Sequence, residues 1–286
     1  MSRLVQAEIT DCRERIPGVW VMEFLAPSLA QAAMPGQFLH IRCGEGSDPL
    51  LRRPISIHAV DRQTGRVKIM FQVVGKGTSR LAGRKNGLID IMGPLGHGFT
   101  IFTGERAKYG NVDTLSTQND SAVVMNTPAN FIVVGGGIGA APLYFLLQEM
   151  ARMGRIRRVK VLLGARCADQ LLIFDAAEEL GFSIRVATDD GSVGRRGPVT
   201  DLLAEELRRE AGYVYACGPS PMLRALCAIL HDAGVPGEVS LEERMACGVG
   251  ACLSCVCRVK DAGGLETYRH ACVDGPVFPA GEVVWW

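Results

Sequence analysis

The sequence predicts an antiparallel β-barrel, then an α/β domain with a doubly wound parallel sheet, and then a small C-terminal module. Three observations predict this fold class. Before about residue 100, short strand-like runs are separated by turn signals such as Pro17-Gly18 and Pro35-Gly36. From about residue 130, apolar strands alternate with helical segments. After about residue 240 the alternation stops, and the segment is rich in cysteine.

The N-terminal part has the pattern of a barrel. Strands are expected at 19–24, 37–41, 55–60, 67–73 and 87–92. Many short strands with regular turns are typical of an antiparallel barrel. We therefore expect a barrel domain over residues 1–101.

The middle part has the pattern of a nucleotide-binding sheet. Strands are expected at 131–134, 159–163, 183–187 and 213–216, and helices at 141–153, 170–180, 199–209 and 221–231. This alternation gives a parallel sheet with helices on both faces. We expect the α/β domain over 130–239 and the C-terminal module over 240–286. Residues 102–129 are expected to be a linker or a surface insertion, because their polar run is typical of a loop.

Composition narrows the functional class. With 286 residues, 48% hydrophobic content and 21% charged content, the chain is expected to be globular with about two domains. Its net charge of +1 gives no broad field for nucleic acid or an anionic membrane. We expect no signal peptide and no membrane span. Ten cysteines without an export signal indicate the cytoplasm and a metal or redox role.

The cysteines of the C-terminal module carry the strongest signal. Cys247, Cys252 and Cys255 are spaced Cys-x4-Cys-x2-Cys, as in a plant-type [2Fe–2S] site. Intervening glycines let the backbone wrap closely around a cluster. The alternatives are a structural zinc site or a set of buried free thiols, but zinc sites usually show two paired clusters, and only one Cys-x2-Cys pair is present here. For the fourth ligand we favour Cys272 over Cys257.

Two loops of the α/β domain are candidate nucleotide sites. The first follows a buried strand and opens a helix, which places free N–H groups and the positive helix end where a phosphate can bind. The second follows the fourth expected strand, at the edge where open α/β sheets bind ligands. Either loop alone could be an ordinary tight turn. The candidate residues are Gly135, Gly136, Gly137 and Gly139 in the first loop and Gly218, Pro219 and Met222 in the second.

The barrel half contributes two further motifs. Arg53 leads a strand in Arg-Pro-Ile-Ser, and Gly77 lies in Gly75-Lys76-Gly77-Thr78 after another strand. Arginine suits forked contacts with phosphate, and serine can hydrogen-bond a ring or a ribose. Taken singly, each motif is more often a solvated arginine or an ordinary turn.

Together these motifs resemble the ferredoxin–NADP reductase superfamily. The runs at 93–99, 241–252 and 272–278 narrow the resemblance to the electron-transfer subunits of NAD-linked dihydroorotate dehydrogenases. The resemblance covers nearly the whole chain and keeps the expected order of motifs. It implies an oxidoreductase subunit that uses FAD, a [2Fe–2S] cluster and NAD.

The resemblance also implies roles at matching positions. The FAD contacts would be Arg53, Pro54, Ile55, Ser56, Met70, Phe71, Gln72, Gly77 and Thr78. The two glycine loops would hold the nicotinamide dinucleotide, and Cys247, Cys252, Cys255 and Cys272 would ligate the cluster. Gln72 departs from the family pattern, in which arginine is expected. Arg166 leaves NADP open as an alternative to NAD. No residue is expected to be catalytic, because the cofactors carry the electrons.

The implied partner is an FMN-containing catalytic subunit that oxidises dihydroorotate, in a heterotetramer of two plus two. Electrons would pass from that FMN through the cluster and FAD to NAD⁺, in pyrimidine (UMP) biosynthesis. FAD must stand between the other two groups, because nicotinamide takes two electrons at once and the cluster takes one. The alternatives are a related subunit of a hydrogenase or a ferredoxin-dependent transhydrogenase, and a zinc-stabilised nucleotide sensor without turnover.

Overall fold

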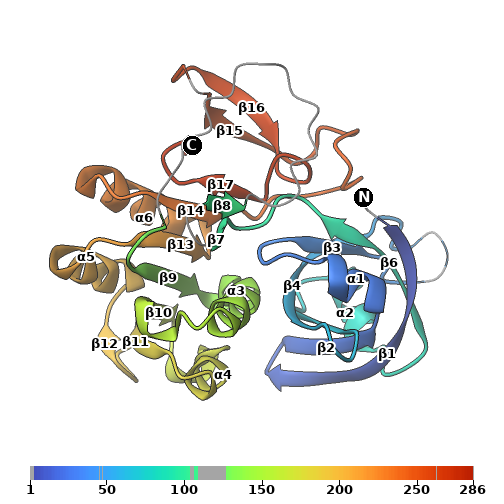
Figure 1. The fold of residues 1–286 in the computed structure, drawn as a ribbon. Helices are drawn as coiled ribbons and strands as arrows, with labels where there is room; N and C mark the ends of the chain where they lie inside the picture. Colours follow the sequence, from blue (N-terminus) through green and yellow to red (C-terminus); the bar gives the residue numbers. More distant parts are fainter. Residues whose placement is uncertain are drawn as a thin grey trace.

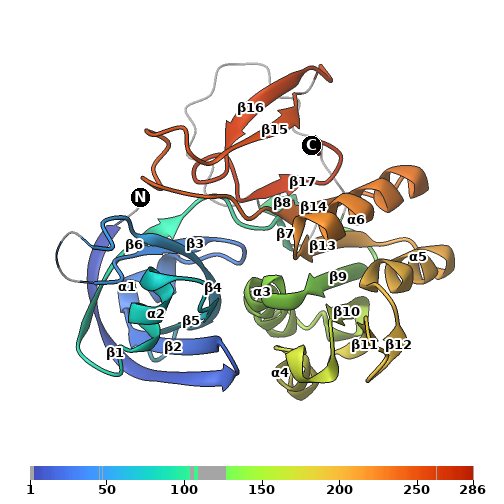
Figure 2. The same cartoon turned by 180° about the vertical axis from the view of Figure 1, so that it is seen from behind.

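The computed structural model describes residues 3–44, 46, 48–103, 106–108, 127–261 and 263–285. Most of the expected linker, 102–129, lies outside these residues. Figures 1 and 2 show the barrel and the α/β domain side by side, with the hairpin of β15 (Val256–Lys260) and β16 (Glu266–His270) above them. The C-terminal segment therefore lies over the junction of the two larger parts.

The expected barrel is confirmed. Six antiparallel strands close in the order β1-β2-β5-β4-β3-β6. They are β1 (Arg3–Ile16), β2 (Val19–Leu25), β3 (Phe38–Ile41), β4 (Arg53–Asp61), β5 (Arg66–Gln72) and β6 (Leu88–Leu95), with helices α1 (Pro27–Ala32) and α2 (Lys76–Ala82). Leu39 and Ile41 of β3 belong to the barrel core. Because side chains alternate along a strand, Phe38 and His40 point out of the barrel, toward the C-terminal segment.

The expected parallel sheet is also confirmed. Its order is β12-β11-β10-β9-β13-β14-β17, and all pairs are parallel except β14 with β17. The strands are β9 (Phe131–Gly136), β10 (Val159–Ala165), β11 (Ser183–Thr188), β12 (Arg195–Arg196), β13 (Tyr213–Cys217), β14 (Gly237–Ser240) and β17 (Val277–Pro279). A further pair joins β7 (Ile101–Thr103) and β8 (Arg106–Lys108).

Helices cover both faces of this sheet. One core lies under α3 (Ala140–Arg152) and α4 (Phe174–Glu179), and the other lies under α5 (Val199–Arg209) and α6 (Ser220–Ala233). Short 3₁₀ turns are η1 (Gly137–Gly139), η2 (Ile156–Arg158) and η3 (Ala168–Gln170). The core of each face is built from the alternating apolar side chains of β9, β10 and β13.

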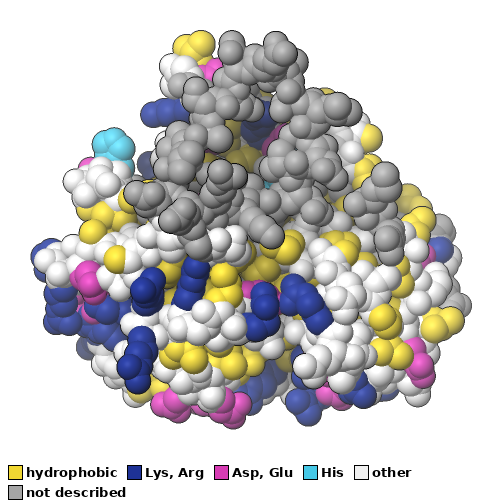
Figure 3. Space-filling model, viewed as in Figure 1, with side chains coloured by type: hydrophobic (Ala, Val, Ile, Leu, Met, Phe, Trp, Pro, Cys, Tyr) yellow, Lys and Arg dark blue, Asp and Glu magenta, His cyan; other side chains and the backbone are white. Residues whose placement is uncertain are grey.

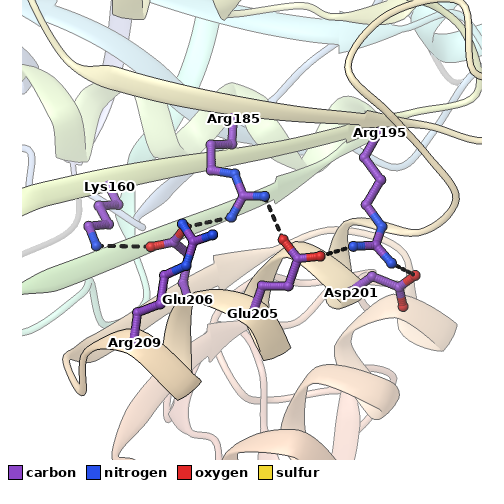
Figure 4. A network of polar contacts seen from close by, with 7 residues as sticks. All are labelled: Lys160, Arg185, Arg195, Asp201, Glu205, Glu206 and Arg209. Atoms are coloured by element: carbon purple, nitrogen blue, oxygen red, sulfur yellow. Dashed lines mark hydrogen bonds and ion pairs between the residues drawn. The ribbon is translucent and has the colours of Figure 1, made fainter.

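An ion-pair network fixes α5 to the strands beneath it (Figure 4). The Glu206 carboxylate is almost fully buried and accepts from Lys160 Nζ at 2.9 Å and from Arg185 at 2.5 Å. Glu205 pairs with Arg185 at 2.6 Å and also with Arg195. With Arg209 at 3.6 Å, three cations surround the buried Glu206 carboxylate and compensate its desolvation, so the network anchors the helix rather than weakening it.

Two expectations about elements were wrong. The helix expected at 170–180 is split into η3 and α4, and the intervening residues Leu172 and Ile173 are buried in the core outside any helix. In addition, β17 was not expected. It joins the antiparallel edge of the α/β sheet, so the cysteine-rich segment is tied to that domain by backbone hydrogen bonds.

Buried polar contacts hold the barrel against the α/β domain. Thr100, which follows the barrel, donates its backbone N–H to Glu238 of β14 at 2.8 Å. Tyr215 donates its hydroxyl to the Thr100 carbonyl at 2.7 Å. On β4, His58 Nδ1 lies 2.7 Å from the Ala141 carbonyl of α3. These contacts set the distance between the two domains, and with it the shape of the space between them.

The visible face in Figure 3 carries charges of both signs. On the face in Figure 3, Lys and Arg side chains are mixed with apolar and acidic ones and form no single continuous patch. Within the described part of the chain, no helix has the length and apolar character that crossing a membrane requires.

Candidate functional site

A cavity of about 340 Å³ opens where the three parts of the chain meet. The barrel contributes Arg53, Pro54, Ile55, Ser56, Met70, Phe71, Gln72 and Thr78, all of them expected FAD contacts. The α/β domain adds Ile138, Ala141 and Pro142 at the start of α3, and the C-terminal segment adds Glu242, Glu243 and Met245. The walls are mostly apolar with a few charged groups, as is usual for cofactor sites.

At one end of this first cavity, the α2 turn lies against Arg53. The arginine Nη1 donates to the carbonyls of Leu51 at 2.8 Å and Arg52 at 3.2 Å. A Cβ on Gly77 would stand only 2.8 Å from Arg53 Nε, so glycine is what allows the guanidinium to lie over the turn. Thr78 Oγ1 accepts from the backbone N–H of Val74 at 3.0 Å and closes the turn. The turn thus offers backbone N–H groups and one fixed cation to an anion.

A second cavity, of about 400 Å³, lies at the carboxyl edge of the parallel sheet. Gly136 and Gly137 of the first glycine loop and Pro219 and Met222 of the second line it. So do Arg166, after β10, and Asp189, after β11. This is the edge at which open α/β sheets bind dinucleotides.

The remaining glycines of the two loops do not line the cavity but allow the loops to touch. A Cβ on Gly139 would stand 2.5 Å from Gly218 Cα, and a Cβ on Gly218 would stand 2.4 Å from Met222 Cε. Gly135 packs against Ala140 of α3, where a Cβ would stand 3.1 Å from the alanine Cβ. Only Gly137 has a positive φ, of 52°. At most of these positions glycine is needed because neighbouring atoms leave no room for a Cβ, and not because the backbone has a positive φ.

The cysteine loop lies on the other side of the first cavity. Gly248 and Gly250 have φ of 73° and 79°, a conformation that glycine adopts without strain. The Val249 N–H points at Cys247 Sγ at 3.4 Å, and the Gly250 N–H points at Cys272 Sγ at 3.2 Å. Backbone N–H groups directed at sulfur stabilise thiolate and cluster sulfur.

The four candidate thiols fall into two pairs. The Val249 N–H and the Cys252 thiol lower the pKa of Cys247 to about 6. Burial and the adjacent Cys255 raise the pKa of Cys272 to about 12. In the residues that the structure describes, no three His, Cys, Asp or Glu side chains converge on a point that could hold a single ion. Two neighbouring thiol pairs suit a two-iron cluster, which takes four thiolates, better than one zinc ion.

Cys257 lies apart from these pairs. Its thiol points toward the Arg269 carbonyl at 3.5 Å and packs in the core under α6. Cys255 and Cys272 instead share a small core with Phe38. The geometry therefore favours Cys272 over Cys257 as the fourth ligand.

Shared wall residues connect the second cavity, the first cavity and the cysteine loop, which therefore lie in a row. Gln72 and Ile138 line both cavities. Phe38 and Met245 line the first cavity and also pack against Cys255 and Cys272. The first cavity thus lies between the second cavity and the cysteine loop, separated from each by about one side chain.

Several of these residues were not anticipated from the sequence. Glu242 and Glu243 line the first cavity, and burial raises the pKa of both carboxyls. Cys217 lines it too, and burial, reinforced by Glu242, holds the pKa of its thiol far above the usual value. Asp189 could have been found from the sequence, because it follows directly on an expected strand of the parallel sheet.

Comparisons with known proteins assign the α/β domain and the C-terminal segment to two different family models. A family model described as the iron-sulfur cluster binding domain of dihydroorotate dehydrogenase B matches residues 242–284. A second, described as an oxidoreductase NAD-binding domain, matches residues 133–228.

Relatives that match nearly the whole chain carry names that agree with the first family model. A protein of Desulforamulus reducens is 43% identical over all of both chains, and one of Geobacillus thermodenitrificans is 42% identical over 90% of this chain and 89% of its own. Both are named electron transfer subunit of dihydroorotate dehydrogenase B (NAD(+)).

Among solved structures, an NADH-dependent reduced ferredoxin-NADP oxidoreductase matches 98% of this chain and 90% of its own at a TM-score of 0.77 and 30% identity. A ferredoxin NADP+ reductase from Neisseria gonorrhoeae with bound FAD and NADP shares the fold at 0.60, over 81% of this chain and 92% of its own, with 15% identity.

Proposed function

This chain belongs to the family of electron transfer subunits of NAD(+)-linked dihydroorotate dehydrogenase B, and we propose that it conducts electrons between a catalytic partner and NAD⁺. FAD occupies the first cavity, NAD occupies the second, and a [2Fe–2S] cluster is held by Cys247, Cys252, Cys255 and Cys272. The chain is thus an oxidoreductase subunit that supplies no catalytic side chain for dihydroorotate itself.

One observation supports the proposal above all others: the second cavity, the first cavity and the cysteine loop lie in a row and share wall residues. Gln72 and Ile138 separate the two cavities, and Phe38 and Met245 separate the first cavity from the buried thiols. FAD, when bound, exchanges hydride with nicotinamide and single electrons with an iron–sulfur cluster. The central position is therefore the one that the chemistry assigns to the flavin.

The barrel residues hold and shield the flavin. Arg53 and the α2 turn bind the pyrophosphate through charge and backbone N–H groups. Pro54, Ile55 and Phe71 form apolar walls that exclude water, and Ser56 offers a hydroxyl to the ring system. Gln72 lines both cavities, so the residue that departs from the family's arginine would contact both the flavin and the nicotinamide.

The α/β domain binds the dinucleotide along its sheet edge. The glycine loop that leads into α3 lets the pyrophosphate approach the backbone, and the helix N-terminus favours its charge. Pro219 and Met222 close the opposite wall. Arg166 follows the second strand of the domain, where an acidic residue would select NAD, and Asp189 follows the third; both line the second cavity. NAD as the acceptor is supported by the NAD(+) in the names of the relatives.

The cysteine loop faces the partner. Cys255 and Cys272 are buried toward the flavin cavity, whereas Cys252 is exposed beside Val249 and Leu253, which are 50% and 62% exposed. Electrons that arrive from outside therefore meet the exposed side of the loop first. We propose that residues 249–254 dock on an FMN-containing catalytic subunit, in a cytoplasmic complex of two plus two chains that serves pyrimidine biosynthesis.

Co-expression with that catalytic subunit tests the proposal. Dihydroorotate-dependent reduction of NAD⁺ should require both chains, and size-exclusion chromatography with light scattering should give the mass of two plus two. If the chain alone oxidises dihydroorotate, or if the complex reduces no NAD⁺, the proposal fails. Coupling of NADH to ferredoxin and NADP⁺ instead would favour the function named for the structural relative of 30% identity.

A further inference from the structure

His40 has a buried side chain that the fold does not use. The residue is 1% exposed, and both of its ring nitrogens are buried without a hydrogen-bond partner. Among histidines in the described part of the chain, it alone has both nitrogens in this condition. A buried donor left unpaired destabilises the folded state, so a native protein normally supplies it with a partner.

The ring is directed at the cysteine loop. His40 lies on the outward side of β3, beside Phe38, which packs on Cys255 and Cys272. A Cβ on Gly248 would stand 2.7 Å from His40 Nδ1, so the imidazole edge rests directly on the loop between Cys247 and Cys252. The backbone carbonyls of Cys247 and Arg52 are also near the ring, but neither ring nitrogen makes a well-formed hydrogen bond to either of them.

The strand that carries His40 also borders the flavin cavity. In the register of β3 and β4, His40 pairs with Pro54, a wall residue of the first cavity. The imidazole therefore rests on the cysteine loop and is carried by a strand that neighbours the flavin cavity; it belongs to the barrel, whereas the thiols belong to the C-terminal segment. An N–H group in this position would bridge the two parts of the chain.

We propose that His40 donates an N–H hydrogen bond to a sulfur of the bound [2Fe–2S] cluster, either the Cys247 thiolate or a sulfide, and thereby raises its reduction potential. This inference rests on the proposed function, since it needs the cluster. An imidazole carries at least one N–H in either protonation state. Hydrogen bonds to cluster sulfur offset part of its negative charge and favour the reduced form. His40 would thus set the reduction potential of the cluster by direct contact.

Substitution of His40 in the FAD- and cluster-loaded protein tests the proposal. In His40→Leu, the ratio of reduced to oxidised cluster at a fixed potential should fall about tenfold, which is about 59 mV for one electron. His40→Asn and His40→Gln keep an N–H donor, and at least one should restore most of the shift. The FAD potential should stay unchanged in all three. The readout is a redox titration followed by EPR of the cluster and by flavin absorbance.

The outcomes separate this inference from the proposed function. If the purified wild-type protein contains no iron and sulfide, the proposed function itself is wrong. A His40→Leu variant with full iron and sulfide and an unshifted cluster potential would overturn the role of His40 alone, as would Asn and Gln variants that behave like Leu. Should His40→Leu not fold, wild-type protein with ¹⁵N-labelled histidine decides. The reduced cluster should show a ¹⁵N coupling that persists in His270→Asn, and its absence overturns the proposal.

Discussion

The Gly77→Ala substitution tests whether Arg53 and the α2 turn bind the pyrophosphate of FAD. An added Cβ would stand 2.8 Å from Arg53 Nε and 3.2 Å from its Cζ, both shorter than an ordinary van der Waals contact. The backbone of α2 cannot retreat, because Thr78 ties the turn to Val74 and Gly75. The flexible arginine must therefore move, and its guanidinium leaves the place where the FAD pyrophosphate binds.

The magnitude follows from what the arginine would lose. A hydrogen bond to a charged group contributes about 1.5–3 kcal/mol, so FAD should bind about 10- to 100-fold more weakly. The stability of the flavin-free protein should not fall, since alanine is favoured over glycine inside a helix by about 1 kcal/mol. Loss of affinity without loss of stability is the signature of a displaced ligand contact.

The assay is titration of deflavinated protein with FAD, followed by flavin fluorescence, together with thermal unfolding of the same samples. Gly75→Ala is the matched control, because a Cβ at Gly75 meets nothing within 4 Å and its φ of −178° is open to any residue. If Gly77→Ala binds FAD within twofold of wild type, or if Gly75→Ala loses as much affinity, the assignment of Arg53 and Gly77 to the pyrophosphate is wrong.

Three other substitutions test the remaining parts of the account. Cys252→Ser should block electron flow to the partner but keep NADH-to-dye activity through FAD, and full coupled activity would contradict the cluster role. Asp189→Asn should raise kcat/KM for NADPH relative to NADH about tenfold by removing a negative charge from the wall of the second cavity, whereas Asp190→Asn, whose carboxylate accepts from Ser192, should not. Glu206→Gln should cost about 3 kcal/mol or more in the free energy of unfolding at pH 7, and Glu205→Gln, whose side chain is 25% exposed, should cost less. Burial alone would raise the pKa of Glu206, but Lys160 and Arg185 outweigh it and lower the pKa below 4.5. That stabilisation is present above pH 4.5 and is lost as the pH falls through the folded-state pKa, so denaturant midpoints of wild type and Glu206→Gln should converge at low pH.

Local sequence patterns predicted the helices and loops whose formation depends mainly on residues close in sequence. The helix expected at 199–209 forms over those residues, because it is amphipathic, follows Pro198 and faces one core. The first glycine loop lies between β9 and α3 as expected, because a buried strand, a glycine run and a helix form one continuous local unit.

What the sequence could not predict depends on contacts between distant segments. Strand β17 has three residues and exists only because β14 offers an open edge. Glu242 and Met245 reach the flavin cavity only because the C-terminal segment folds back over the barrel. His40 looks like an ordinary strand residue until β3 turns it toward the cysteine loop.

The central claim is that one chain holds nicotinamide, flavin and cluster sites in a row. It is tested most directly on protein purified without oxygen, by its absorption spectrum and by assays of iron, sulfide, zinc and flavin on the same sample. The account predicts one FAD with about two irons and two sulfides per chain, and an EPR signal of the reduced cluster after NADH is added. Zinc without flavin, or a flavin that NADH reduces while the cluster stays oxidised at every potential, would contradict it.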